Sequence, residues 1–136
     1  MSPLNKATAT AARRRGRHRE RLPLPQGAPA ALGYDAVGIP QDDAARVMRR
    51  LSPSRAGCVF SLGELWWWIV PAGSHIDIAW PESTTYSVDA YVPSGPRPRL
   101  VHRPDGDSPY TSPILLYIVT CQIAGTMPSW PHPAHP

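Results

Sequence analysis

Three side chains of a hydrolase triad occur together in the sequence. Ser74, His75 and Asp77 supply a nucleophile, a base and an acid, but they lie within four consecutive residues. A working triad is assembled from distant segments so that the three groups converge. These residues therefore predict a polar loop rather than an active site.

Two further pairs have the residue types of metal ligands. Asp105 and Asp107 could form a two-carboxylate ligand, yet Pro-Asp-Gly-Asp is also an ordinary turn sequence. His132 and His135 have an i, i+3 spacing that suits a metal only on a helix, and the surrounding prolines argue against a helix. We predict no metal site and no cofactor.

Other catalytic signatures are missing from the sequence. It contains no Walker motif, no glycine-rich dinucleotide turn and no cysteine cluster for zinc. Cys58 and Cys121 each lie in an apolar run, which predicts buried thiols, and a single pair defines no disulfide framework. We therefore expect a protein that is not an enzyme.

Positive charge is concentrated at the N-terminus. Residues 1–21 hold seven basic residues and one acidic residue, a charge of +6, whereas the rest of the chain holds seven basic and nine acidic residues, a charge of −2. A basic footprint spread over a folded face is therefore not expected. Arginine outnumbers lysine thirteen to one, and alanine and proline are abundant, which indicates a GC-rich coding bias.

The basic segment predicts a flexible arm that binds DNA or RNA. Residues 1–32 have few large apolar side chains and frequent proline, so they cannot offset the entropy lost on ordering. Arginines that neutralise phosphates release counterions and give sequence-independent affinity. The alternative is a solubilising tail. The candidate nucleic-acid-binding residues are Arg13, Arg14, Arg15, Arg17, Arg19 and Arg21.

The segment Leu65–Val70 contains three consecutive tryptophans. Side chains alternate along a strand, so Trp66 and Trp68 share one face and Trp67 lies on the other, and both faces are apolar. Such a strand is either central and covered on both faces, or keeps one face for a partner. Trp66, Trp67 and Trp68 are thus candidates for stacking on bases or for a protein interface, and alternatively for the core.

Other elements follow from periodicity and from turn residues. Apolar residues at helical spacing predict a helix from about Asp42 to Leu51, and Ser112 and Pro113 predict the start of a second helix that ends at Ala124 before Gly125. The β-branched content of this second segment leaves a strand as the alternative. Alternation and turn signals predict strands at Tyr34–Ile39, Cys58–Leu62, Leu65–Val70, Ile76–Trp80, Tyr86–Val92 and Arg99–His102.

These elements predict a two-layer α+β fold, with an antiparallel sheet and one or two helices on one face. We expect a disordered basic arm (1–32), a small domain (33–125) and a Pro/His-rich tail (126–136). The longest apolar run, 114–124, is shorter than the roughly 20 residues that span a bilayer. No membrane association is expected, and the N-terminus does not resemble a secretory signal, so we expect a cytoplasmic protein.

Four segments resemble a family of small uncharacterised proteins from high-GC bacteria, some of which resemble accessory regions of bifunctional DNA primase/polymerases. The segments are Tyr34-Asp-Ala-Val-Gly-Ile-Pro, Ala56-Gly-Cys-Val-Phe, Trp66-Trp-Trp-Ile-Val-Pro-Ala-Gly-Ser and His102-Arg-Pro-Asp-Gly. The resemblance implies a role near DNA transactions or their regulation. No catalytic carboxylate pair of a primase matches this chain, so no functional residues are carried over.

Together these features predict a small, non-enzymatic binding protein that contacts DNA or RNA through its arginine-rich arm. The alternative is a protein-interaction or dimerisation module that uses the apolar Trp-rich strand and has no nucleic-acid role. Strong salt dependence of binding would distinguish the two, because an apolar interface is far less screened.

Overall fold

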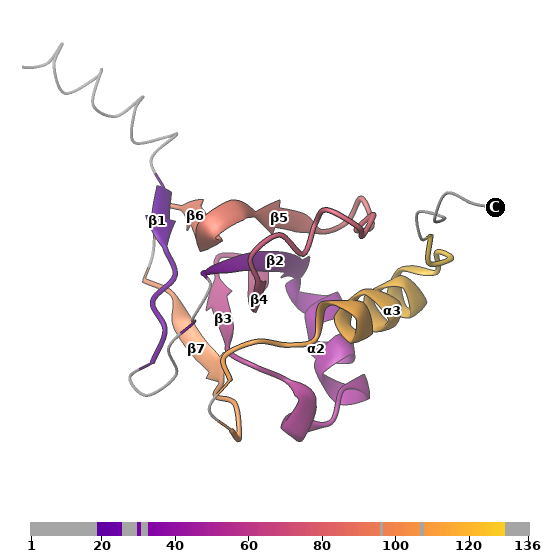
Figure 1. Ribbon diagram of the computed structural model, residues 1–136, viewed down its shortest axis with the longest axis horizontal. Helices are drawn as coiled ribbons and strands as arrows, with labels where there is room; N and C mark the ends of the chain where they lie inside the picture. Colours follow the sequence, from indigo (N-terminus) through magenta and orange to yellow (C-terminus); the bar gives the residue numbers. More distant parts are fainter. Residues whose placement is uncertain (1–18, 26–29, 31–32, 96, 107, 130–136) are drawn as a thin grey trace, which may run out of the picture.

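The computed structural model describes residues 19–25, 30, 33–95, 97–106 and 108–129. Its main element is a five-stranded antiparallel sheet with the strand order β5-β2-β4-β3-β7 (Figure 1). The strands of this sheet are β2 (Tyr34–Pro40), β3 (Val59–Leu62), β4 (Leu65–Pro71), β5 (Thr85–Ser87) and β7 (Arg99–His102).

Strand β4 lies at the centre of the sheet and is covered on both faces. Trp68 and Val70 belong to one cluster of buried side chains, and Trp67 and Ile69 belong to another on the opposite face. Both faces of this strand were predicted to be apolar, with successive side chains alternating between the two faces. This prediction is confirmed. The hairpin to β3 is also confirmed, with Gly63 at a φ of 64° in the turn.

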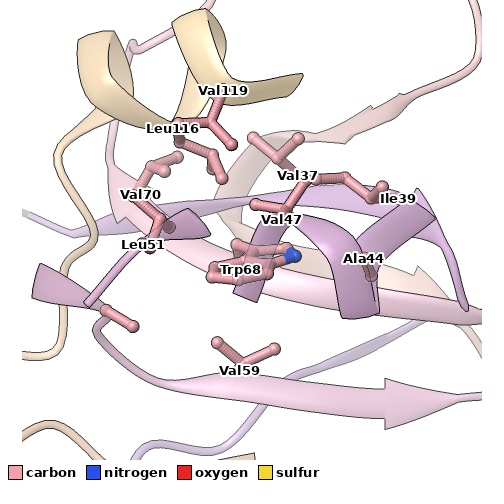
Figure 2. Close-up of a cluster of buried hydrophobic side chains, with 11 residues drawn as sticks. Val37, Ile39, Ala44, Val47, Leu51, Val59, Trp68, Val70, Leu116 and Val119 are labelled. Atoms are coloured by element: carbon pink, nitrogen blue, oxygen red, sulfur yellow. The ribbon is translucent and has the colours of Figure 1, made fainter. Parts of the chain in front are cut away.

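Two helices cover one face of the sheet. α2 (Gln41–Arg50) and α3 (Pro113–Ala124) pack their apolar sides on β2 and β4, as Figure 2 shows. The cluster between the helices and the sheet, which we call the first cluster, consists of Val37, Ile39, Ala44, Val47, Leu51, Ala56, Val59, Trp68, Val70, Leu116 and Val119. A short 3-10 turn, η1 (Pro53–Arg55), follows α2.

The predicted caps of α3 are present. The Ser112 side chain accepts a hydrogen bond from the backbone N–H of Leu115, Pro113 is the first helical residue, and Gly125 has a left-handed φ of 75°. Burial of apolar side chains against the sheet and these caps outweigh the strand propensity of the segment. The α+β class, with an antiparallel sheet and two helices on one face, is as predicted.

The opposite face is covered by a two-stranded antiparallel ribbon. It pairs β1 (Arg19–Arg21) with β6 (Tyr91–Pro93). Leu22, 1% exposed, belongs to the buried cluster on this face, which we call the second cluster. Its members are Leu22, Tyr34, Ala36, Cys58, Phe60, Trp67, Ile69, Ala90 and Val92. Leu22 N–H donates to the Ala90 carbonyl (3.0 Å), and the Tyr34 hydroxyl donates to the Leu22 carbonyl (2.7 Å). The prediction that residues 1–32 are disordered is therefore wrong for residues 19–25. Strand pairing and the packing of Leu22 and Leu24 against the second cluster hold this part on the domain.

Two predicted strands differ from the structure. Residues 76–80 form no strand, because the backbone turns at Gly73 and leaves Ile76 72% exposed with no sheet surface to cover. The predicted strand Tyr86–Val92 is split by a short turn, η2 (Val88–Ala90), in which Asp89 and Ala90 have left-handed φ values of 58° and 57°. This kink moves the chain from β5 in the large sheet to β6 in the ribbon.

Candidate functional site

The ribbon of β1 and β6 places two of the predicted arginines on the surface. Arg19 lies opposite Pro93 and Arg21 lies opposite Tyr91 in the ribbon. Residues directly opposite each other in an antiparallel pair project from the same face. All four are exposed, whereas Val92, between Tyr91 and Pro93, is buried. The outer face of the ribbon therefore carries two arginines and an aromatic ring.

Arg21 is also tied to the domain. Its Nε–H donates to the Asp89 carbonyl (3.1 Å), and its guanidinium lies 4.2 Å from the centre of the Tyr34 ring. Burial raises the pKa of Tyr34, and the Arg21 charge partly opposes this shift. The arginine thus fixes the ribbon on the second cluster. Among the other candidates, Arg13, Arg14, Arg15 and Arg17 lie outside the described residues.

A further arginine, Arg97, absent from the predicted site, shares a groove with residues of the ribbon. A groove of about 340 Å³ is lined by Arg21, Arg97 and one carboxylate, Glu20, together with the apolar residues Leu22, Leu62 and Val92. Arg99, two residues further on, begins the edge strand β7 and is exposed. The sequence prediction missed these two arginines because it used the net charge of residues 22–136, which is −2. A summed charge does not show where individual charges lie on the surface.

The arginines Arg19, Arg97 and Arg99 have no carboxylate partner among the described residues. The ion pair found there joins Arg46 and Asp43 (3.8 Å), and His75 Nδ1 lies 3.9 Å from Asp35 Oδ2. Exposed and unpaired guanidinium groups keep their donors available for a ligand anion. We call the surface formed by Arg19, Arg21, Arg97 and Arg99 the basic flank; the strands that carry it lie on one side of the molecule (Figure 1).

The predicted stacking role of the tryptophans is wrong for two of them. Trp67 and Trp68 are 1% and 0% exposed and fill the two opposite clusters, so neither ring can reach a ligand. Trp66 is half-buried and packs against the first cluster. The core alternative holds for this strand. The exposed aromatic ring of the ribbon is Tyr91, 42% exposed, which no sequence signal singled out.

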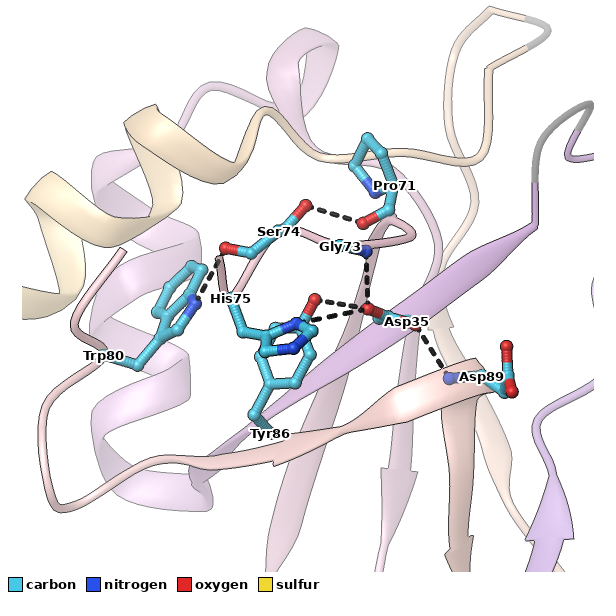
Figure 3. Close-up of polar contacts among 8 residues, drawn as sticks. All are labelled: Asp35, Pro71, Gly73, Ser74, His75, Trp80, Tyr86 and Asp89. Carbon is cyan, nitrogen blue, oxygen red and sulfur yellow. Dashed lines mark hydrogen bonds and ion pairs between the residues drawn. The ribbon is translucent and has the colours of Figure 1, made fainter. Parts of the chain in front are cut away.

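A buried carboxylate organises the loops at one end of the sheet (Figure 3). Asp35 on β2 is 1% exposed, and its Oδ2 accepts hydrogen bonds from Gly73 N–H (2.8 Å) and from the Tyr86 hydroxyl (2.5 Å). Its Oδ1 accepts the Asp89 N–H (2.7 Å). Burial and the hydrogen bond to Asp35 raise the pKa of Tyr86 well above its ordinary value. The carboxylate thus holds the β4 exit and the η2 kink together.

The triad components do not assemble around this carboxylate. The Ser74 hydroxyl donates to the Pro71 carbonyl (2.6 Å), so it is engaged with its own turn. The carboxylate nearest to His75 is Asp35, at 3.9 Å, and Asp77 is exposed. The His75 ring packs against the Tyr86 ring in a tilted arrangement, with the ring centres 4.8 Å apart. The only hint of this cluster in the sequence is an acidic residue inside an apolar strand.

The described residues hold no group of three or more His, Cys, Asp or Glu side chains that could bind a metal. Asp107, His132 and His135 lie outside those residues. Cys58 and Cys121 are buried free thiols, as predicted, and burial raises the pKa of Cys58. Within the same part of the chain, neither helix has the length and apolar character needed to cross a bilayer.

Comparison of the chain with protein-family models, with curated proteins and with solved structures found no match. The resemblance to small proteins of high-GC bacteria stays a prediction. The function must therefore be argued from the surface itself.

Proposed function

We propose that this protein is a non-enzymatic nucleic-acid-binding protein whose contact surface is the basic flank. The observation that carries the proposal is the presence of Arg21 and Arg97 in the lining of one groove, with Arg19 on the same strand as Arg21 and Arg99 two residues after Arg97. Four exposed arginines, none of which has a carboxylate partner among the described residues, suit a chain of phosphates. Arg13, Arg14, Arg15 and Arg17 precede β1 directly in the sequence and extend the same charge.

Anchoring by β1 gives the arm a defined origin. The pairing of β1 with β6 and the burial of Leu22 hold Arg19 on the domain. Arg17 is only two residues before Arg19 in the sequence, so a ligand that contacts the preceding arginines can also reach the basic flank. Two adjoining basic segments on one chain act together, because binding to the first raises the local concentration of the ligand at the second.

The proposal is tested by fluorescence anisotropy of labelled DNA with the full-length protein over a salt series. Replacing Arg19, Arg97 and Arg99 by glutamine should weaken binding and flatten the dependence of log K on log salt. Each phosphate contact that is lost lowers the slope by about 0.7 for single strands and about 0.9 for duplex DNA.

A matched control removes three positive charges from another part of the domain. Arg49, Arg50 and Arg55 are exposed, have no carboxylate partner among the described residues, and lie on α2 and η1, away from the ribbon. Replacing them by glutamine should leave the salt slope nearly unchanged. Failure of the wild-type protein to bind at low salt, or an equal loss in the control, would overturn the proposal.

A protein-interaction role is the second candidate, and one observation favours it. The predicted interface on the Trp-rich strand is buried, but β7 is an edge of the five-stranded sheet, and its Leu100 and Val101 are each 38% exposed. An edge strand offers unpaired backbone groups to a second strand. Light scattering on the wild-type protein and on Leu100→Lys would detect a dimer that this change disrupts, and a wild-type monomer at all concentrations would exclude self-association.

A further inference from the structure

We infer that the ligand of the basic flank is single-stranded nucleic acid, and that one of its bases stacks on Tyr91. This inference rests on the proposed function and adds the class of ligand and the residue that selects it. Its basis is the arrangement of one exposed ring among the arginines of the ribbon.

The position of Tyr91 is fixed while its ring is left at the surface. Its neighbours Ala90 and Val92 are 0% and 1% exposed, and its backbone N–H donates to the Val88 carbonyl. The backbone of β6 is therefore held by the core, whereas the Tyr91 side chain is 42% exposed on the outer face. A ligand that stacks on this ring therefore needs no rearrangement of the backbone that carries it.

Two arginines lie on β1, the strand that pairs with the strand of this ring. Arg21 is directly opposite Tyr91 across the ribbon, and Arg19 is on the same face two residues along the strand. Arg97 lines the groove at the inner side of β1. Only Nε of Arg21 hydrogen-bonds to a described residue, so its terminal nitrogens can meet a phosphate. Stacking rings interleaved with arginines are the means by which single strands are bound without sequence preference.

The shape of the ribbon favours a single strand over a duplex. A two-stranded ribbon reads duplex DNA by entering the major groove, which is about 8.5 Å deep. Here each strand has three residues, and the inner face is packed on the second cluster through Val92. The ribbon therefore lies flat on the domain. A flat surface reaches unpaired bases, but it does not reach bases that are stacked inside a duplex.

The experiment compares a labelled thymidine oligonucleotide with a duplex of equal length, using the full-length protein and its variants. Tyr91→Leu removes the ring and should weaken single-strand binding at least about fivefold. Tyr91→Phe keeps the ring and should bind within about twofold of the wild type. Ile114→Ala, which changes a 54% exposed side chain on α3, is the control and should have no effect. Circular dichroism melting checks that each variant is folded.

The possible failures are distinguishable. Equal, steeply salt-dependent binding of single strand and duplex, unchanged in Tyr91→Leu, would overturn this inference and leave the proposed function standing. Equal losses in Tyr91→Leu and Tyr91→Phe would also overturn it, because the hydroxyl and not the ring would then matter. Absence of binding to both oligonucleotides would overturn the proposed function together with the inference.

Discussion

Arg21 on β1 lies directly opposite Tyr91 on β6, and its guanidinium lies 4.2 Å from the centre of the buried Tyr34 ring. The same arginine therefore attaches the ribbon to the core and contributes to the surface that we propose binds nucleic acid. Changes to Arg21 would affect stability and binding together, so the binding tests use Arg19, Arg97, Arg99 and Tyr91.

Leu22 should be essential for the stability of the whole domain. It is 1% exposed and connects β1 to the second cluster, so Leu22→Ala should lower the free energy of unfolding by about 2–5 kcal/mol. Leu100→Ala, at a side chain that is 38% exposed, should change it by less than about 1 kcal/mol. Urea unfolding monitored by tryptophan fluorescence measures both. Equal, small effects would contradict the placement of residues 19–25.

Asp35→Asn should destabilise the loops around the η2 kink. The amide keeps one acceptor oxygen but presents an NH₂ group where the carboxylate receives donors, so at least one hydrogen bond to a charged group is lost. We expect a loss of about 2–3 kcal/mol in urea unfolding. Asp77→Asn, at an exposed position, is the matched control and should be neutral. A neutral Asp35→Asn would refute the structural role of this carboxylate.

Gly38 should not tolerate a side chain. It is opposite Trp67 in the β2–β4 pair, and a Cβ at Gly38 would lie 2.8 Å from the Trp67 ring. Because Trp67 is packed in the second cluster, Gly38→Ala should lower the free energy of unfolding by about 1–3 kcal/mol. At Gly95 a Cβ would meet nothing within 4 Å, so Gly95→Ala serves as the control. Thermal melting that ranks the two variants in the opposite order would contradict this packing.

Stability should fall in alkaline solution because of Tyr86. Burial and the hydrogen bond to Asp35 raise its pKa in the folded state, whereas in the unfolded chain it titrates near its ordinary value of about 10. Above that pH the unfolded chain has released this proton and the folded protein has not, so the free energy of unfolding decreases as pH rises. Below it, Tyr86 contributes no pH dependence.

Urea midpoints measured between pH 8 and pH 11 test this effect. Tyr86→Phe should be less stable than the wild type at pH 8, because its hydrogen bond to Asp35 is missing, and should lose less stability between pH 10 and pH 11. Tyr34 and Cys58, whose pKa values are also raised by burial, leave a residual slope in the variant. Parallel curves for the two proteins would show that Tyr86 does not titrate differently in the folded state.

Local patterns were sufficient to predict the centre of the fold. The alternation in Leu65–Val70 predicted a strand that is apolar on both faces, and Ser112, Pro113 and Gly125 predicted both ends of α3. These signals depend on neighbouring residues, so a single sequence contains them. The contacts that position the candidate site, by contrast, join residues that are far apart in the sequence.

The candidate site depends on contacts between distant residues. The left-handed Asp89 and Ala90 have no glycine to signal them, and the Asp89 N–H is held by Asp35, 54 residues away. Pairing of β1 with β6 joins residues 19–21 to 91–93, and the groove brings Arg97 beside Arg21. No local pattern predicts such pairings, which is why the arm was expected to be free and Tyr91 was not a candidate.

A titration of the ¹⁵N-labelled full-length protein with a thymidine oligonucleotide, followed by NMR of the backbone amides, tests the central claim most directly. We predict that the largest shifts fall on the amides of residues 19–22, 91–92, 97, 99 and 100, and that they diminish as salt is raised. Shifts confined to the amides of α2 and α3, or no shifts at low salt, would contradict the claim that the basic flank binds nucleic acid.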